Sequence, residues 1–311
     1  MRNFYLLLIC FCAPLSLLGQ QEPLYAQYRT NLFVINPAYA GTLSYNELRL
    51  NYRSQWRRFP GAPQTLTMSY HGMVDEKNGL GFIAFNDAVG PDTRNGGQFS
   101  YAYHLPLGWG GTMGQNYLSL GVGVKLLQYQ FRADRVFFAD QTDPTIAEVA
   151  VPIYLGDASF GAYFHNDNFF AGISAPNLLQ SDFSGSIDGS QPNLLSRLYR
   201  HYFAIFGYRF VYDNMTIEPN VLIKKVQTSP YQAEGLVKFH LVDEKMFIGV
   251  GYRTDWLLTT MFGFKANRLH FIYSADFMPV QRSAAQVYGA SHEFTVGIDL
   301  NDNWKQFYEG E

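Results

Sequence analysis

Past residue 12 the sequence lacks cysteine, because its 2 cysteines, Cys10 and Cys12, both lie near the beginning of the chain. Such a chain cannot be a disulfide-bonded scaffold, and thiol catalysis and cysteine-ligated metals are excluded as well. Charge is also scarce, since charged residues make up 16% of the chain against about 25% in typical soluble domains. The formal net charge of -3 gives no reason to expect nucleic acid as a partner.

Long apolar runs are missing after the first 19 residues. Residues 1–19 combine Arg2 with an apolar run over 4–18 and a change to polar residues at 20–22, which is typical of a secretory signal peptide. That run is shorter than the about 20 residues that a membrane-spanning helix needs, so we expect cleavage near Gly19. Because no later run of about 18 apolar residues occurs, a membrane protein built from the rest would have to be a β-barrel.

Aromatic residues are abundant, at 17% of the chain, and much of the sequence alternates between apolar and polar positions. In segment 47–56 the even positions are Leu48, Leu50, Tyr52, Ser54 and Trp56, and the odd positions are Glu47, Arg49, Asn51, Arg53 and Gln55. This period of two is typical of an extended strand with one apolar and one polar face.

The same alternation recurs along the whole chain. The further segments are 64–74, 79–86, 97–106, 115–127, 157–165, 168–175, 200–211, 215–224, 231–241, 245–253, 257–266, 268–277 and 290–300. Together they predict about fourteen strands of roughly ten residues, the even number and length of an outer-membrane barrel. Strands of soluble β-sandwiches also have one apolar face, but most are only about five or six residues long.

The predicted connections alternate in length. Tight turns are expected at 75–78, 166–167, 212–214, 242–244 and 266–267, a loop at 87–95, and long segments at 128–156, 176–199 and 278–289. Two connections fit poorly, since 107–114 is long for its side and 254–256 is short. Short periplasmic turns and long outer loops are typical of outer-membrane barrels. We therefore predict an all-β fold, a transmembrane antiparallel β-barrel in the outer membrane of a Gram-negative bacterium.

The faces of the strands follow from this prediction, with apolar side chains toward lipid and polar ones toward the lumen. An arginine facing lipid at the bilayer midplane costs about 2–4 kcal/mol, and one facing the lumen costs far less. From the sequence we therefore expect Leu50→Arg or Ile248→Arg to impair assembly, and Arg49→Leu to be tolerated.

The domain organisation expected from these patterns has four parts. They are a signal peptide at 1–19, a periplasmic lead-in at 20–45, the β-barrel at 46–300 and a C-terminal tail at 301–311. Prolines and a glycine punctuate the lead-in, so we expect an extended or partly helical segment at the periplasmic mouth.

The predicted lumen is lined by charges of both signs, among them Glu47, Arg49, Arg53, Glu218, Lys224, Glu234, Lys238, Arg253, Arg268, Asp276 and Glu293. A pore that selects ions of one sign would carry a ring of one charge. A mixed lining favours ion pairs across a packed interior that the lead-in or the long loops fill, with a passive porin as the alternative.

The sequence contains no recognisable catalytic, cofactor or metal signature. The 7 histidines are dispersed without paired spacing, at positions 71, 104, 165, 201, 240, 270 and 292. Ser69 and His71 share a strand face, as in a lipid-modifying barrel enzyme, but polar lining is the simpler interpretation and no G-x-S-x-G motif occurs. Gly121 and Gly123 give lumen space in a strand and do not form a phosphate loop, since no helix follows them.

Three sequence pieces, INPAYAG at 35–41, QWRRFPGAP at 55–63 and NDAVGP at 86–91, resemble the PorP/SprF family of type IX secretion system outer-membrane proteins. Segments 169–179 and 217–256 resemble it as well. The positions that match the family's motifs are Asn36, Pro37, Ala38, Tyr39, Gly41, Gln55, Trp56, Gly61, Ala62, Pro63, Asn86, Asp87, Gly90 and Pro91. They are candidate partner contacts, although prolines and glycines also set turns, Trp56 can anchor at the membrane interface, and Asn86 with Asp87 can cap a strand end.

The resemblance implies an outer-membrane component of protein export in a Bacteroidota-type bacterium, without catalytic residues or cofactors. The implied partners are periplasmic ring and motor proteins of the system, or a secreted adhesin-like cargo as in gliding motility, besides outer-membrane lipid. The alternatives are a passive porin and a lipid-modifying barrel enzyme.

Overall fold

The fold is described from a computed structural model of the chain. The structure describes residues 26–108, 115–136, 151–181, 198–227, 229–254, 256–277 and 289–302. Across these ranges, none of the helices is long and apolar enough to cross a bilayer.

Strands make up most of the described chain. In order they are β1 (Tyr45–Ser54), β2 (Gln64–Met73), β3 (Asn78–Val89), β4 (Asp92–Pro106), β5 (Tyr117–Phe131), β6 (Ile153–His165), β7 (Phe169–Ala175), β8 (His201–Tyr208), β9 (Phe210–Tyr212), β10 (Met215–Val226), β11 (Gln232–Leu241), β12 (Met246–Arg253), β13 (Leu257–Ala266), β14 (Leu269–Phe277) and β15 (Ser291–Asp302). The described residues also include three short 3-10 helices: η2 (Leu32–Val34), η3 (Pro37–Tyr39) and η4 (Ala133–Arg135).

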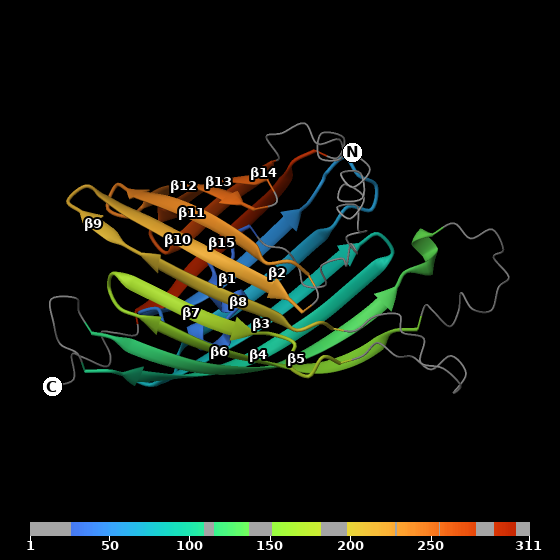
Figure 1. The fold of residues 1–311 in the computed structure, drawn as a ribbon, viewed down its shortest axis with the longest axis horizontal. Coiled ribbons are helices and arrows are strands. Elements are labelled where there is room, and N and C mark those ends of the chain that lie inside the picture. Colours follow the sequence, from blue (N-terminus) through green and yellow to red (C-terminus); the bar gives the residue numbers. More distant parts are fainter. Residues whose placement is uncertain are drawn as a thin grey trace, which may run out of the picture.

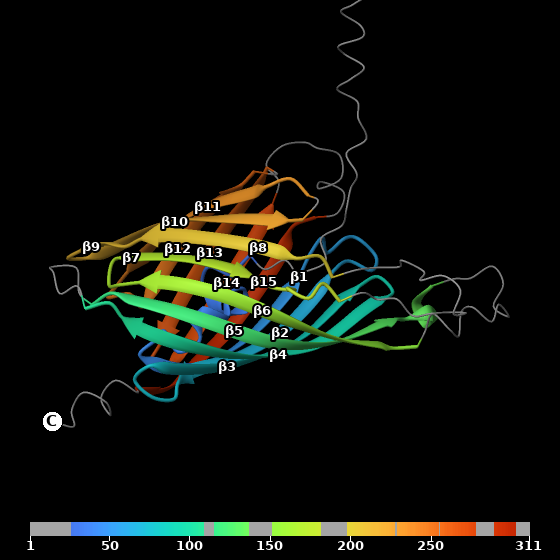
Figure 2. The ribbon, with the colours of Figure 1, turned by 60° about the horizontal axis from the view of Figure 1, so that its bottom comes forward.

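The strands form one closed antiparallel ring (Figures 1 and 2). The ring closes where β1 pairs with β15, with Leu50 opposite Val296, and β10 joins β8 to β11. The short strand β9 pairs with the beginning of β10 on the edge that β8 uses further along, so it is an extra strand beside a 14-strand barrel. The predicted all-β barrel is confirmed, and closure satisfies the backbone hydrogen bonds that lipid cannot.

The two faces of the wall differ as the alternation predicts. In β1, Leu50 is 49% exposed and faces outward, whereas Glu47 and Arg53 are 2% and 3% exposed and face the lumen. The outer face of the other strands carries the large exposed apolar side chains, such as Val124 and Ile248. An apolar exterior around a polar interior suits a ring surrounded by lipid.

The connections define two ends of the barrel. The short-turn end holds connections 74–77, 166–168, 213–214, 242–245 and 267–268, together with the longer 107–116. The long-loop end holds connections 55–63, 132–152 and 176–200, together with shorter ones such as 254–256. Apart from the connection predicted at 87–95, the alternation of lengths follows the prediction, including the two connections that fit poorly.

The prediction of a loop at 87–95 is wrong. β3 continues to Val89 and β4 begins at Asp92, so only Gly90 and Pro91 form the turn. The polar residues in between pair across the strands, and the Asn86 side chain donates a hydrogen bond to the Asn95 Oδ1 at 2.6 Å. Polar residues look like a loop in sequence, but here they pair within the β-ladder of β3 and β4.

One of the tight turns at the short-turn end is closed by Asp75. Its carboxylate accepts hydrogen bonds from the backbone N–H groups of Lys77 and Asn78, both at 2.9 Å. These bonds, first of all the one from Lys77, hold the pKa of the Asp75 carboxyl below its usual value. An acidic residue that binds its own turn in this way explains why this connection is so short.

Candidate functional site

The segment that precedes β1 lies inside the ring. Residues 26–44, called the plug below, include η2 and η3 and are mostly buried, with Phe33 and Ala38 both 0% exposed. The plug begins at Ala26, next to the part of β15 nearest the long-loop end, and reaches β1 at the short-turn end. The lead-in is expected at the periplasmic mouth from its sequence, whereas its described part occupies the lumen.

The carboxylate of Glu293 anchors the beginning of the plug. It accepts hydrogen bonds from the backbone N–H groups of Ala26 at 2.6 Å and Gln27 at 3.3 Å. From the wall it accepts bonds from Asn51 Nδ2 and from an Arg53 guanidinium nitrogen, both at 2.8 Å. Because Glu293 is fully buried, these donors take the place of water around its charge. One side chain of β15 therefore joins the plug to the barrel.

A second anchor lies on β11. The Arg29 guanidinium forms an ion pair with Glu234, and the Tyr28 hydroxyl donates a hydrogen bond to the same carboxylate. The Lys238 ammonium lies 3.5 Å from the carbonyl oxygen of Arg29, to which it donates. All of these groups are buried, so removing one partner would leave a charge without compensation in the interior.

The INPAYAG piece forms the second half of the plug. The Asn36 side chain caps η3, because its Oδ1 accepts a hydrogen bond from the Ala38 N–H at 3.0 Å. Its Nδ2 donates to the carbonyl oxygens of Ala162 and Ile173, at 3.1 and 3.3 Å. Asn36 therefore shapes the plug and binds it to β6 and β7 at once.

Two histidines hold the end of the plug. Gly41 has a φ of +79°, which favours glycine, and its N–H donates to Nδ1 of His71 at 3.3 Å. The Nε2 of His104 lies 3.0 Å from the carbonyl oxygen of Ala40. The ring of Tyr39 packs edge-on against His71, with centroids 5.6 Å apart. These histidines are lumen side chains that bind the plug.

Glycines in the wall let the plug approach the strands closely. A Cβ atom on Gly79 would overlap the carbonyl oxygen of Ala40, and one on Gly121 would overlap the backbone of Ala38. From the sequence, Gly121 is expected to give space in the lumen. The structure shows that the plug backbone fills this space.

We therefore expect Gly121→Ala to destabilise the barrel by about 1–3 kcal/mol, because the added methyl group overpacks the contact with η3. The matched control is Gly235→Ala, since a Cβ atom there meets nothing within 4 Å. Denaturant unfolding followed by heat-modifiable gel mobility measures both variants. Equal midpoints for the two alanine variants would contradict the close contact.

The other two motif pieces meet at the long-loop end. The Gln55 N–H donates to the Pro63 carbonyl oxygen at 2.9 Å and so closes the 55–63 loop. The Gly90 N–H donates to the Gly61 carbonyl oxygen at 2.8 Å, which joins this loop to the turn between β3 and β4. Gly61 and Gly90 both have positive φ, at +73° and +59°, so glycine suits these positions.

The expectation that Asn86 and Asp87 cap a strand end is wrong, because both lie within β3. Asp87 is buried and accepts a hydrogen bond from the Thr65 hydroxyl at 2.7 Å. Trp56, by contrast, is 42% exposed at the rim.

The structure thus divides the motif residues into two groups. Those of the first piece lie in the lumen against the wall, buried except for the half-buried Tyr39: Asn36, Pro37, Ala38, Tyr39 and Gly41. Those of the other two pieces lie at or near the long-loop end: Gln55, Trp56, Gly61, Ala62, Pro63, Asn86, Asp87, Gly90 and Pro91. Sequence reasoning identified Glu234 and Glu293 as lumen charges and missed that they anchor the plug. The only signal in the sequence is their inward-facing position in the strands, and this position does not indicate which residue they contact.

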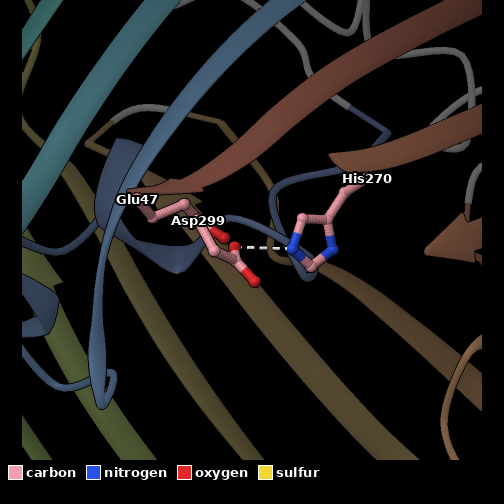
Figure 3. Close-up of side chains that lie close together, drawn as sticks. All are labelled: Glu47, His270 and Asp299. Carbon is pink, nitrogen blue, oxygen red and sulfur yellow. Dashed lines mark hydrogen bonds and ion pairs between the residues drawn. The ribbon is translucent and has the colours of Figure 1, made fainter. Parts of the chain in front are cut away.

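Within the described residues, Glu47, His270 and Asp299 form a cluster whose ligand atoms lie within 4.8 Å of one another (Figure 3). The His270 imidazole points at Asp299, with Nε2 and a carboxylate oxygen 2.6 Å apart. Arg49 pairs with Glu47 at 2.7 Å, and Lys265 pairs with Asp299 at 2.9 Å. Both carboxylates therefore face cations already. We interpret the cluster as an ion-pair network that joins β1, β14 and β15.

Ser69 and His71 do lie on the lumen face of β2, and both bind the plug. The Ser69 hydroxyl accepts a hydrogen bond from Asn31 Nδ2 at 2.8 Å, and His71 accepts from Gly41. A nucleophile for lipid needs access to lipid, whereas these side chains are 2% and 1% exposed. Their geometry supports a structural role.

A family model described as "Type IX secretion system membrane protein PorP/SprF" matches residues 17–298 of the chain. No curated protein matches.

Two solved structures are similar to the chain at low sequence identity. The Acinetobacter baumannii outer membrane protein Omp33 is 9% identical, with 82% of this chain and 98% of that chain covered and a TM-score of 0.46. The Pseudomonas putida toluene transporter TodX is 9% identical, with 92% and 96% covered and a TM-score of 0.45.

Proposed function

Because the chain belongs to the PorP/SprF family of type IX secretion system membrane proteins, we propose that it is a closed, non-enzymatic barrel of this system in the outer membrane. It supports export or surface attachment of secreted proteins, such as adhesins, through protein contacts. The partners that we propose are periplasmic ring or motor components, or the cargo itself, in a Bacteroidota-type cell where gliding motility is one use.

The plug is the observation that carries this proposal. It crosses the lumen between β11, β15 and the glycine-bearing strands, and one buried ion pair together with hydrogen bonds to Glu293 holds it on one side. A wide aqueous path needs an empty lumen, as in porins. A barrel filled in this way suits a platform for protein partners better than a diffusion channel.

A hollow of about 900 Å³ remains beneath the plug at the short-turn end. Its lining includes the plug residue Thr42, Lys245 of the β11–β12 turn and Asn267 of the β13–β14 turn. With short turns in the periplasm, as we propose, this mouth faces the periplasmic components. The motif loops at the opposite end then face the cell surface, where the cargo arrives.

The division into signal peptide 1–19, lead-in 20–45, barrel 46–300 and tail 301–311 remains part of the proposal. The signal peptide and residues 303–311 of the tail lie outside the described residues.

Affinity purification after mild detergent extraction tests the proposal. We expect periplasmic system components or a secreted protein to copurify with the tagged chain, and planar bilayers to show almost no conductance. As a matched control, an unrelated outer-membrane barrel with the same tag should capture neither. Steady porin-like conductance without any copurified partner would overturn the proposal in favour of a channel, and a lipid A mass shift on deletion of the gene would favour an enzyme.

A further inference from the structure

On β15, β1 and β2 the outer face of the barrel changes from apolar to polar near the long-loop end. Across β15, β1 and β2, the outward row Phe294, Tyr52 and Leu66 is apolar or aromatic. The next outward row toward the long-loop end is His292, Ser54 and Gln64, and all three side chains are polar. On a membrane barrel such a change marks the boundary between the acyl chains and the lipid headgroups.

A hollow of about 410 Å³ lies at this boundary, beneath the 55–63 loop. We call it the rim niche and define it by Tyr52, Arg57, Phe59, His292 and Phe294. Three aromatic rings give it apolar walls, and two of them belong to the lipid-facing surface.

The polar groups of the rim niche are cationic or neutral. Arg57 is exposed on the loop, and no carboxylate is among the described residues that line the hollow. His292 is fixed against the wall, since its Nδ1 lies 2.8 Å from the Tyr273 hydroxyl and the two rings stack. A guanidinium group is the side chain best suited to bind phosphate, because it offers two parallel N–H donors and a permanent charge.

We propose that the rim niche binds the phosphate-bearing headgroup of a membrane lipid. Arg57 contacts the phosphate, His292 lies beside the headgroup, and an acyl chain runs along Tyr52 and Phe294. The site needs only the membrane location of the barrel and is independent of the role in secretion. Its ligand chemistry is a phosphate ester next to acyl chains, as found in glycerophospholipids and in lipid A.

Native mass spectrometry of the full-length protein in detergent tests this site. Phosphatidylglycerol, monophosphoryl lipid A and diacylglycerol, which lacks phosphate, are titrated separately. We expect at least one phosphate-bearing lipid to bind more tightly than diacylglycerol, and the tighter of the two identifies the source. Arg57→Gln should lower the affinity for that lipid about tenfold, which is the loss expected for a charge-assisted hydrogen bond.

The matched control is Arg135→Gln, an exposed arginine at the same end of the barrel but outside the rim niche. It should change binding less than twofold, and both variants should keep wild-type heat-modifiable mobility because both side chains are on the surface. A variant Arg57→Lys should retain part of the affinity. Equal binding of diacylglycerol and the phosphate lipids, or equal effects of the two glutamine substitutions, would overturn the proposal.

Discussion

Replacing Glu293 with leucine is expected to lower the free energy of unfolding by about 3–5 kcal/mol and to loosen the plug, because a buried ion pair loses one partner. Arg53 would keep only Asp276, which it contacts at 2.6 Å, and the N–H groups of Ala26 and Gln27 would lose their acceptor. These donors would stay buried without a hydrogen bond unless the plug moves and admits water.

Two measurements follow from this expectation. Denaturant unfolding should show a lower midpoint than for the wild type. In planar bilayers the variant should show a conductance well above the very low conductance expected of the wild type. The control is Glu244→Leu, because Glu244 pairs with Arg209 at an exposed position, where an ion pair is worth at most about 1 kcal/mol. If Glu293→Leu kept the unfolding midpoint and the very low conductance of the wild type, the plug would not depend on this carboxylate.

Replacing Leu50 with arginine is expected to prevent most of the protein molecules from assembling in the membrane. Leu50 lies on the outward face in the middle of β1, 49% exposed, between Val296 and Met68 of the neighbouring strands. An arginine there would face the acyl chains, at a cost of about 2–4 kcal/mol near the midplane. Ile248→Arg on β12 should behave alike, since that side chain is 48% exposed on the same face.

Heat-modifiable gel mobility after refolding into lipid vesicles measures this loss. Leu50→Ala is the control at the same position, and it should assemble nearly as well as the wild type, because fluid lipid closes around a smaller side chain and leaves no cavity. A soluble protein would give the opposite order, in which a surface arginine is harmless. Normal assembly of both arginine variants would show that this face does not meet lipid.

The strands and their faces could be predicted because alternation is a local property. Leu50 and Glu47 must point to opposite sides of any extended strand, whatever the rest of the chain does. Strand ends were harder to place, as the hairpin around Gly90 shows. Side chains such as Asn86 are polar although they pair within the β-ladder, and sequence alone does not distinguish that environment from a loop.

Arg49 shows where sequence reasoning needed the tertiary structure. Its inward position predicts that leucine is tolerated there, since only the lumen is affected. The structure shows Arg49 paired with Glu47 at 2.7 Å and donating to the Thr30 carbonyl oxygen of the plug at 2.5 Å. We now expect Arg49→Leu to be destabilising, because it leaves a buried carboxylate with one partner fewer.

The amino-acid sequence by itself determined the all-β class, the number of strands, the lipid-facing side and the family, since each of these depends on neighbouring residues. Only the tertiary structure decided that the lumen is filled, which residues hold the plug, and that Gly61 and Gly90 meet at the rim. The physical reason is that Ala26 and Glu293 stand at opposite ends of the chain, and only closure of the ring brings that carboxylate to the N–H group that it binds.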